Sequence, residues 1–295
     1  MDKFKAMLGG KKEAKPANNT TTNTTTAPAT TTTPATTSTP ATTTVPATTN
    51  TPATTTTPAT TTVVAGTTAI KAEKPIKMYS HAGGPNPWKV AIIMNELGIP
   101  YTTELLEFEN MKKEPFESVN PNGRVPAIED PNTGLTLWES GSIIQYLLET
   151  YDTTNKLSYA TGKEKWEASN WFHLQTSGQG PYWGQKAWFT LYHPEKDLTS
   201  VLDRYSNEIR RLLGVINSHL KKSGKPYLVG DKVTYADLAF VPWHWLVILP
   251  PHLMGAEFEK EWQTSYPEAW AWNQRLQERP SVVKAKEERL KAMGM

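Results

Sequence analysis

The segment GGPNPWKV at residues 83–90 places an asparagine, Asn86, between two prolines just before a run of helix-forming residues. Asparagine is a favoured helix N-cap, and a proline is tolerated at the first helical position because its missing N–H would be unpaired there. A helix N-terminus also concentrates free N–H groups and positive potential, which stabilises a thiolate and lowers its pKa. Asn86 is therefore predicted to cap the helix, to direct its amide at a ligand, or to do both.

The elements that must position Asn86 follow from hydrophobic spacing and turn residues. Strands are predicted at 76–79, 101–108, 125–130 and 134–140, and helices at 88–98, 112–119 and 140–151, the last capped by Ser140. Turn formers between the last two strands predict an antiparallel hairpin. The resulting order of strands and helices predicts a thioredoxin-like α/β domain over residues 71–154.

Strand patterns fade in the second half of the chain, residues 155–295. Helices separated by Gly and Pro are predicted at 163–177, 197–222, 234–248 and 266–291. In DKVTYADL, Thr234 and Asp237 have the spacing of a capping box. This half is predicted to be an all-helical domain.

The first 70 residues have a different composition. Residues 20–62 are almost entirely Thr, Pro and Ala, with a proline at every sixth position from 28 to 58. Such a segment cannot bury enough apolar surface to offset its chain entropy. Residues 1–70 are therefore predicted to form a disordered tail.

Charge and composition exclude several classes of function. Residues 1–75 carry a net charge of +4, which leaves −2 for the rest of a chain whose total is +2, and this argues against a nucleic-acid partner. The absence of cysteine excludes disulfides and protein thiol chemistry, and six histidines without metal-ligand spacing argue against a metal cofactor. With no signal-peptide pattern and no long apolar run, a cytoplasmic protein without a membrane partner is predicted.

Four motifs carry a family resemblance: VNPNGRVPAI at 119–128, LWESG at 137–141, SGQGPYWGQ at 177–185 and GDKVTYADLAF at 230–240. With them, the region from Ile76 to Arg289 resembles the soluble glutathione transferases and is similar to the fungal branch that includes the yeast nitrogen-regulation protein with a prion-forming tail. The tail here is rich in Thr, Pro and Ala rather than Asn and Gln. Because its regular prolines oppose stacking of β-strands, prion behaviour is not expected.

The resemblance implies that the Asn86 side-chain amide donates a hydrogen bond to the sulfur of glutathione. In other classes of the family this donor is a Tyr or Ser at the end of the first strand, or a Cys near the helix start. Cysteine is absent here, so Ser80 and Tyr79 stay as the alternative catalytic residues.

Glutathione has two carboxylates and one amino group, which the site must hold. Ser140, at a helix N-terminus, is expected to bind the γ-glutamyl carboxylate, and Glu139 to bind the γ-glutamyl amino group. The alternative for Glu139 is a solvated acid at a helix start.

The resemblance also implies a cis peptide bond before Pro126, with the backbone of Val125 pairing with the cysteinyl backbone of glutathione. Arg124 is then placed to reach the glycine carboxylate. Lys112 or Lys113 is expected to assist it or, alternatively, to be a surface charge.

Flat aromatic side chains are suited to an aromatic co-substrate. Tyr182 and Trp183 are expected to line this pocket because they lie in GQGPYWGQ, with Trp188 and Trp243 as further candidates. The alternative is that these side chains form the hydrophobic core.

The predicted function is therefore that of a glutathione transferase, a detoxification enzyme that activates the thiol of glutathione, its co-substrate, for attack on small electrophiles. A homodimer is expected from the resemblance. Two alternatives stay open: a glutathione-dependent peroxidase or disulfide-bond reductase on the same site, and a regulatory binding protein that retains a transcription factor.

Overall fold

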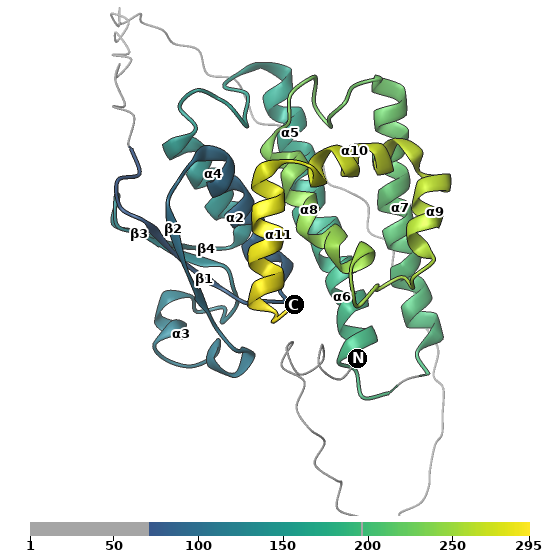
Figure 1. Cartoon of the computed structure of the whole chain (residues 1–295), viewed down its shortest axis with the longest axis horizontal. Coiled ribbons are helices and arrows are strands. Elements are labelled where there is room, and N and C mark those ends of the chain that lie inside the picture. Colours follow the sequence, from purple (N-terminus) through teal and green to yellow (C-terminus); the bar gives the residue numbers. More distant parts are fainter. Residues whose placement is uncertain (1–70, 196) are drawn as a thin grey trace, which may run out of the picture. The chain divides into compact units, whose positions relative to one another are not determined.

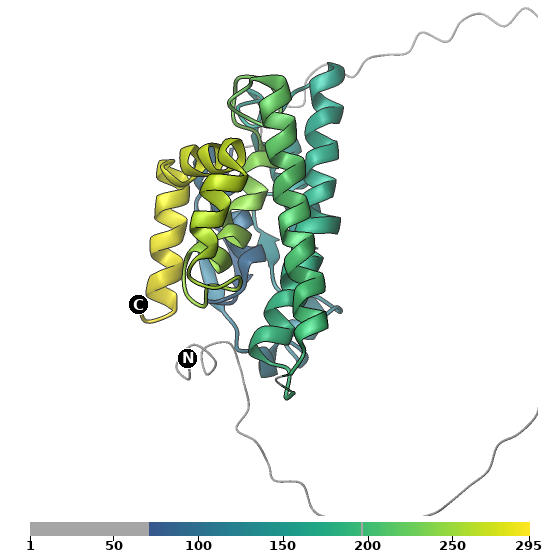
Figure 2. The ribbon, with the colours of Figure 1, turned by 90° about the vertical axis from the view of Figure 1, so that its right-hand side faces the viewer.

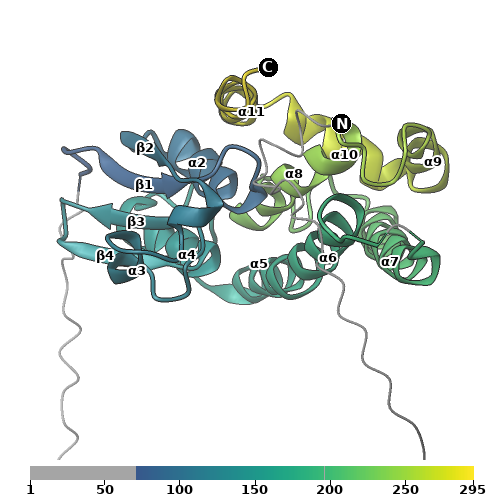
Figure 3. The ribbon, with the colours of Figure 1, turned by 90° about the horizontal axis from the view of Figure 1, so that it is seen from below.

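The computed structural model describes residues 71–195 and 197–295. The first half of this region contains a four-stranded mixed sheet. The predicted disordered tail, residues 1–70, lies outside this part of the chain. The strands are β1 (Ile76–Ser80), β2 (Tyr101–Leu105), β3 (Ala127–Asp130) and β4 (Leu135–Trp138). Their order in the sheet is β2-β1-β3-β4, with β1 parallel to β2 and antiparallel to β3, and β3 antiparallel to β4 (Figure 3). The thioredoxin-like fold and its hairpin are confirmed.

Helices pack on both faces of this sheet. They are α2 (Pro85–Leu97), α3 (Phe116–Val119) and α4 (Ser140–Tyr151), and a 3₁₀ turn, η1 (Phe108–Asn110), follows β2 without burying a side chain. Met78 and Ile128 join the main core with α2 and α4, whereas Tyr79 packs with Phe116 of α3 in a separate small cluster. Because neighbouring side chains of a strand point to opposite faces, Met78 and Tyr79 belong to different sides of the sheet.

Helix α2 begins earlier than its sequence pattern predicts. Gly84 holds the N-cap position, Pro85 is the first helical residue, and Asn86 is the second. Both prolines fit here because the first N–H groups of a helix have no acceptor within it. The expectation that Asn86 caps this helix is therefore wrong, and its side chain is left for another contact.

The second half is helical, as predicted. Its elements are α5 (Gly162–Leu174), the π-helical turn η2 (Gln175–Gln179), α6 (Gly180–Leu191), α7 (Thr199–Ser223), α8 (Tyr235–Ile248), α9 (Phe258–Ser265), α10 (Pro267–Gln277) and α11 (Pro280–Ala292). The α5–η2–α6 segment is continuous and lies beside α7 (Figure 2). Sequence patterns missed α6 and α9, and merged α10 with α11. No helix in the described part of the chain is long and apolar enough to cross a membrane.

Helix α8 is the central element of this half, and it is buried from Tyr235 to Val247. Its capping box is confirmed: the backbone N–H of Thr234 donates to Asp237 Oδ2 at 2.9 Å. The same carboxylate accepts from the backbone N–H of Leu228 and from Trp272 Nε1, both at 2.9 Å. Asp237 thus joins the start of α8 to the preceding loop and to α10.

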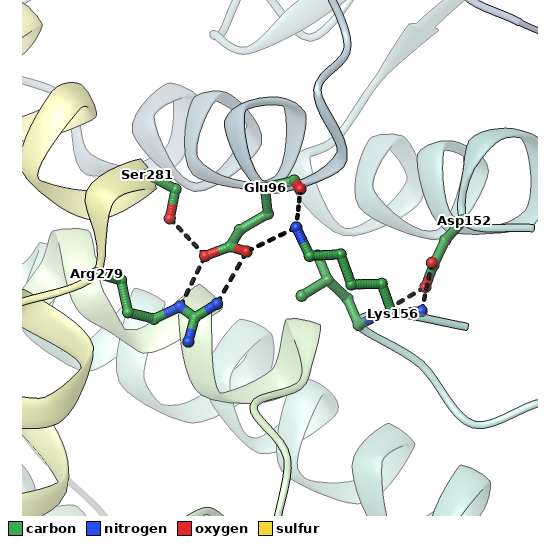
Figure 4. Close-up of polar contacts among 6 residues, drawn as sticks. Glu96, Asp152, Lys156, Arg279 and Ser281 are labelled. Carbon is green, nitrogen blue, oxygen red and sulfur yellow. Dashed lines mark hydrogen bonds and ion pairs between the residues drawn. The ribbon is translucent and has the colours of Figure 1, made fainter. Parts of the chain in front are cut away.

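A buried carboxylate joins the two halves. Glu96, near the end of α2, accepts two hydrogen bonds from Arg279, at 2.7 and 2.9 Å, and one from Ser281 at 2.6 Å (Figure 4). Lys156, which follows α4, lies 3.4 Å from the same carboxylate. Burial pushes the pKa of Glu96 upward, but Arg279, Ser281 and Lys156 outweigh burial and hold the pKa below its usual value. Since Arg279 and Ser281 begin α11, this cluster fixes α11 against α2, where Figure 1 shows them side by side.

Replacing Glu96 by Gln should lower the free energy of unfolding by about 3 kcal/mol, because Arg279 would keep a charge without its counter-ion. The pKa of Glu96 is lower in the folded than in the unfolded protein. Its contribution is therefore present above the unfolded pKa, about 4.3, and is lost as the pH falls below that value. Urea unfolding of wild type and Glu96→Gln at pH 7 and pH 3 measures both effects.

The matched control is Glu167→Gln, which breaks an exposed pair with Lys163 on the surface of α5. This change should leave the unfolding curve near that of wild type. Equal effects of the two substitutions would show that the Glu96 cluster does not hold the halves together.

Candidate active site

A cavity of about 680 Å³, here called the polar cavity, opens between α2, the start of α4 and the α5–η2–α6 segment. Asn86, Arg124, Glu139 and Ser140, four of the residues predicted to bind glutathione, all line it. They come from three separate segments of sequence, since Glu139 and Ser140 are neighbours. The fold therefore brings together at one cavity groups that the resemblance assigned to one ligand.

A second cavity of about 540 Å³, here called the apolar cavity, adjoins it. Its wall is mostly apolar and includes Phe108, Met111, Leu191, Tyr192 and Leu246. Five residues line both cavities: Asn86, Arg124, Gly184, Trp188 and Trp243. Asn86 thus lies at the junction between a polar and an apolar compartment.

The carboxamide of Asn86 has a defined orientation. The indole N–H of Trp243, on α8, donates to Asn86 Oδ1 at 3.2 Å. Because an indole nitrogen is a donor, it selects the carbonyl oxygen of the amide, and the NH₂ group is left to donate elsewhere. Asn86 also lies in the first turn of α2, where unpaired backbone N–H groups and the helix dipole favour negative charge. The arrangement is suited to an anionic atom at the junction.

Ser80 and Tyr79, the alternative donors, lie away from both cavities. Ser80 is 0% exposed, and its hydroxyl has no hydrogen-bond partner. The Tyr79 hydroxyl accepts from Lys77 Nζ at 2.7 Å and donates to Glu129 Oε1 at 2.6 Å, on the α3 side of the sheet. Neither residue lines the cavities that Asn86 lines.

The corner between β4 and α4 presents a helix N-terminus to the polar cavity. Glu139, not Ser140, holds the N-cap position, and it does so without a side-chain capping bond, which corrects the predicted cap. The backbone of Glu139 has φ 68° and ψ 116°, a sparsely populated conformation that proteins retain mainly at functional sites. Ser140, Gly141 and Ser142 line the cavity, so the first turn of α4 is available to a carboxylate.

The motif NPNGRV forms the loop that carries Arg124 and Val125. Asn120 holds this loop, because its amide donates to the carbonyl of Arg124 at 2.5 Å and its Oδ1 accepts from the N–H of Asn122 at 2.9 Å. Gly123 has φ +60°, and a Cβ there would lie 2.8 Å from the carbonyl oxygen of Met111. Glycine is therefore required at this position.

Both residues of this loop reach the cavities. Arg124 lines both cavities and Val125 lines the apolar one, and the Val125–Pro126 peptide bond is cis, as expected. Of the two candidate lysines, Lys112 lines the apolar cavity, and Lys113 lines neither cavity.

Tyr182 and Trp183 were expected in the electrophile pocket, and the structure places them elsewhere. Trp183 is buried in the core of the helical half, and Tyr182 packs against the same core beside Tyr205. On α6 the cavities are instead lined by Gly184, Trp188 and, for the apolar one, Leu191. These positions recur at three to four residues and so lie on one face of the helix, a period that the sequence contains.

His81 and Lys89 are among the lining residues that were missed. His81 lines the apolar cavity and stacks on Phe108, with 4.3 Å between ring centroids. Lys89 lines the polar cavity one turn after Asn86 and is only 2% exposed. Lys89 follows Asn86 by three residues, which on a helix places the two side chains on the same face. This position was overlooked because the residues around Lys89 are mostly apolar. Within 71–195 and 197–295, no group of three His, Asp or Glu side chains is placed to hold a metal ion.

Comparisons with known proteins agree with this geometry. The model of the glutathione S-transferase N-terminal domain matches residues 78–155, and that of the C-terminal domain matches residues 181–280. The glutathione S-transferase-like protein OpS6 of Beauveria bassiana is 49% identical over 211 residues, which are 72% of this chain and 94% of that protein. The transcriptional regulator URE2 of Saccharomyces cerevisiae is 33% identical over 252 residues, covering 72% of this chain and 69% of that protein.

A solved structure shows the same fold. The glutathione transferase URE2P6 of Phanerochaete chrysosporium, in complex with oxidized glutathione, has a TM-score of 0.68 and 43% identity, covering 75% of this chain and 98% of that one. The chain belongs to the glutathione S-transferase family. Within it, the similarity is to fungal members of the Ure2p type, which confirms the resemblance seen in the sequence.

His81 should stay neutral at physiological pH. Burial, and then the positive charge of Arg289, lower the pKa of its imidazole to about 4. The unfolded chain binds a proton near pH 6.5, so this residue should reduce stability as the pH falls from about 6.5 to about 4. NMR titration of the His81 ring, assigned with His81→Asn, measures the pKa, and the variant should lose less stability than wild type over this interval. A midpoint near 6.5 would contradict the prediction.

Proposed function

We propose that this protein is a glutathione transferase that binds glutathione in the polar cavity and an electrophile in the apolar cavity. The observation that carries the proposal is the position of Asn86 at their junction, with its carbonyl held by Trp243 and its NH₂ group left to donate. A sulfur atom at this point would face both compartments. Solved structures of related proteins in complex with oxidized glutathione or glutathione support the choice of ligand.

The remaining groups suit the ends of the tripeptide. The first turn of α4, at Ser140, supplies the hydrogen-bond donors proposed for the γ-glutamyl carboxylate, and Glu139 is the proposed partner of the amino group. Arg124, which lines both cavities, is the proposed partner of the glycine carboxylate. With both ends held, the cysteinyl sulfur is brought to Asn86.

The reaction then follows from charge stabilisation. The N-terminus of α2 and the Asn86 amide favour the thiolate over the thiol, so the proton of the thiol leaves to solvent at a lower pH than in free glutathione. The thiolate attacks the electrophilic carbon, a carbon–sulfur bond forms, and the leaving group departs with the electron pair of its bond. The apolar wall, with Phe108, Leu191 and Tyr192, favours an aromatic or alkyl electrophile.

One set of assays separates the alternatives. Conjugation of an aryl halide, reduction of an organic hydroperoxide and reduction of a mixed glutathione disulfide are measured on the same sample. The proposal requires the first to have the highest kcat/KM. Dominance of the second or third would indicate a peroxidase or reductase, and no turnover in any would favour a regulatory binding protein. The cytoplasmic location stays a prediction.

Asn86→Ala should raise the pKa of the bound thiol and lower kcat/KM by about tenfold to a hundredfold, or about 1.4–2.7 kcal/mol of lost stabilisation. Asn86→Asp is the sharper variant, because it retains an oxygen for Trp243 and a negative charge suits the second position of a helix. It places that charge beside the thiolate, however, and removes the donor. The kcat/KM of wild type should exceed that of Asn86→Ser, and the kcat/KM of Asn86→Ser should far exceed that of Asn86→Asp. The three proteins should have similar melting temperatures.

The controls are Ser80→Ala and Tyr79→Phe, which remove the hydroxyls that lie outside both cavities. Both should keep kcat/KM within about twofold of wild type. If Asn86→Asp retained full activity while Ser80→Ala lost it, the donor would be Ser80.

We also propose a homodimer formed through the side of the molecule that carries β4 and α5. Leu135 and Trp138 on β4 and Trp166 on α5 are exposed, with Trp166 at 67%, and the two elements lie along the same side in Figure 3. Trp166 borders a cavity of about 560 Å³ between α4 and α5. Leu135 and Trp138 point to opposite faces of the sheet, but both lie on its edge strand, and exposed apolar side chains along such an edge are typical of an interface.

The paired substitution Leu135→Glu and Trp166→Glu should convert the dimer into a monomer at micromolar concentration, because two charges from each protomer would be buried at a two-fold contact. Val215→Glu, on the exposed surface of α7, is the control and should stay dimeric. Sedimentation velocity distinguishes the species. A wild-type monomer with full activity would overturn this proposal.

A further inference from the structure

Lys89 is a buried lysine with no counter-ion among the residues that the structure describes. Its side chain is 2% exposed, and Nζ donates to Gln175 Oε1 at 3.0 Å. No ion pair of Lys89 is found within the described residues. An ammonium group has three donors, so this one neutral bond leaves two of them for another acceptor.

Such a group is costly in a ligand-free protein. Burying an unpaired ammonium costs several kcal/mol, roughly, unless the group loses its proton. Burial lowers the pKa of Lys89 to about 7, and the charge of Glu139 offsets this only in part. An anion in the polar cavity would remove the cost and restore the charge.

The amine is held in place by a chain of amides. Gln175 Nε2 donates to Gln179 Oε1 at 3.0 Å, and Gln179 Nε2 donates to the carbonyl of Phe240 at 3.2 Å. Both glutamines belong to the π-helical turn η2, a type of turn that is frequent at functional sites. These hydrogen bonds determine that Gln175 presents its oxygen, Oε1, to Lys89, because the amide of each glutamine both donates and accepts.

This part of the polar cavity also contains the start of α4. A Cβ on Gly141 would lie 3.6 Å from the Cγ2 of Thr176, so the first turn of α4 packs directly on the residue next to Gln175. The other charged or titratable groups that line the cavity are Arg124, Glu139 and His173. Lys89 and the N-terminus of α4 are thus two sources of positive potential that face one compartment from different helices.

We propose that the ammonium of Lys89 is the counter-ion of the γ-glutamyl α-carboxylate of bound glutathione and holds it together with the first turn of α4. This inference rests on the proposed function, since it names a binding residue for the same ligand. It gives the polar cavity a charge-specific contact that the family resemblance did not supply. Lys89 acts in binding and does not contact the reacting sulfur, which Asn86 holds.

The first experiment compares glutathione with γ-aminobutyryl-cysteinylglycine, which lacks this carboxylate. Wild type should bind glutathione at least tenfold more tightly than the analogue. Lys89→Met should weaken glutathione binding to a similar extent, leave binding of the analogue within twofold, and not lower the melting temperature of the free protein. The control is Lys186→Met, a second buried lysine that lines neither the polar nor the apolar cavity and should bind both ligands as wild type does.

The second experiment measures protons. S-methylglutathione, which has no thiol to ionise, is titrated at pH 8 by calorimetry in buffers of different ionisation enthalpy. Lys89 is mostly neutral at this pH and must gain a proton to pair with the carboxylate, so wild type should take up more protons per site than Lys89→Met. Arg124, Glu139 and His173 are present in both proteins, so the difference in proton uptake between them measures the protonation of Lys89.

The outcomes separate the inference from the proposed function. If wild type binds glutathione but does not discriminate against the analogue, the inference falls and the proposed function stands. The same holds if Lys89→Met weakens both ligands equally, which would indicate a structural role. If wild type binds neither glutathione nor S-methylglutathione, both proposals fall together.

Discussion

The position of α2 depends on a buried carboxylate at its end. Glu96 is held by Arg279 and Ser281 from α11 and lies near Lys156 after α4, so one side chain joins three segments of the chain. At the other end of the same helix, Asn86 accepts from Trp243 of α8 and Lys89 donates to Gln175 of η2. The helix belongs to the thioredoxin-like half in sequence, but the helical half fixes both of its ends.

This dependence explains why the site lies where it does. The first turn of α2 supplies the positive potential, and α8 determines which atom of the Asn86 amide is free to donate. A shift of α2 relative to α8 would break this bond and move Asn86 from the junction of the two cavities. The geometry of the proposed sulfur site is thus a property of the contact between the halves, which is also where a ligand pocket is expected.

Much of the fold follows from local sequence. The hairpin of β3 and β4 was predictable because Pro131, Asn132 and Gly134 specify a turn, and the capping box of Thr234 and Asp237 was predictable because its partners are three residues apart. The gathering of Arg124, Glu139 and Ser140 with Asn86 followed from the family motifs. The exact start of α2 was not predictable, because two prolines allow either of two first residues.

Contacts between distant residues were beyond such reasoning. The bond between Lys89 and Gln175 spans 86 residues, and that between Glu96 and Arg279 spans 183. A lysine or glutamate on a helix is normally solvated, so its burial depends on packing that no local pattern reports. Trp188 and Trp243, named from the sequence as further candidates, do line both cavities, whereas the helical period could favour Trp188 over Trp183 only once α6 was known to be a helix.

The π-helical turn η2 determines which side chains of α5 and α6 face the polar cavity. Phe172, Thr176, Gly180, Gly184 and Trp188 all line the polar cavity, and they recur at intervals of four residues. In a regular α-helix each such interval overshoots a full turn by about 40°, so over four intervals the row would wind by about 160° and leave the cavity. The wider turn of η2 takes up one residue, about 100° of this drift, and leaves about 60°, so a single row stays on the wall from the compartment proposed for glutathione to the one proposed for its electrophile.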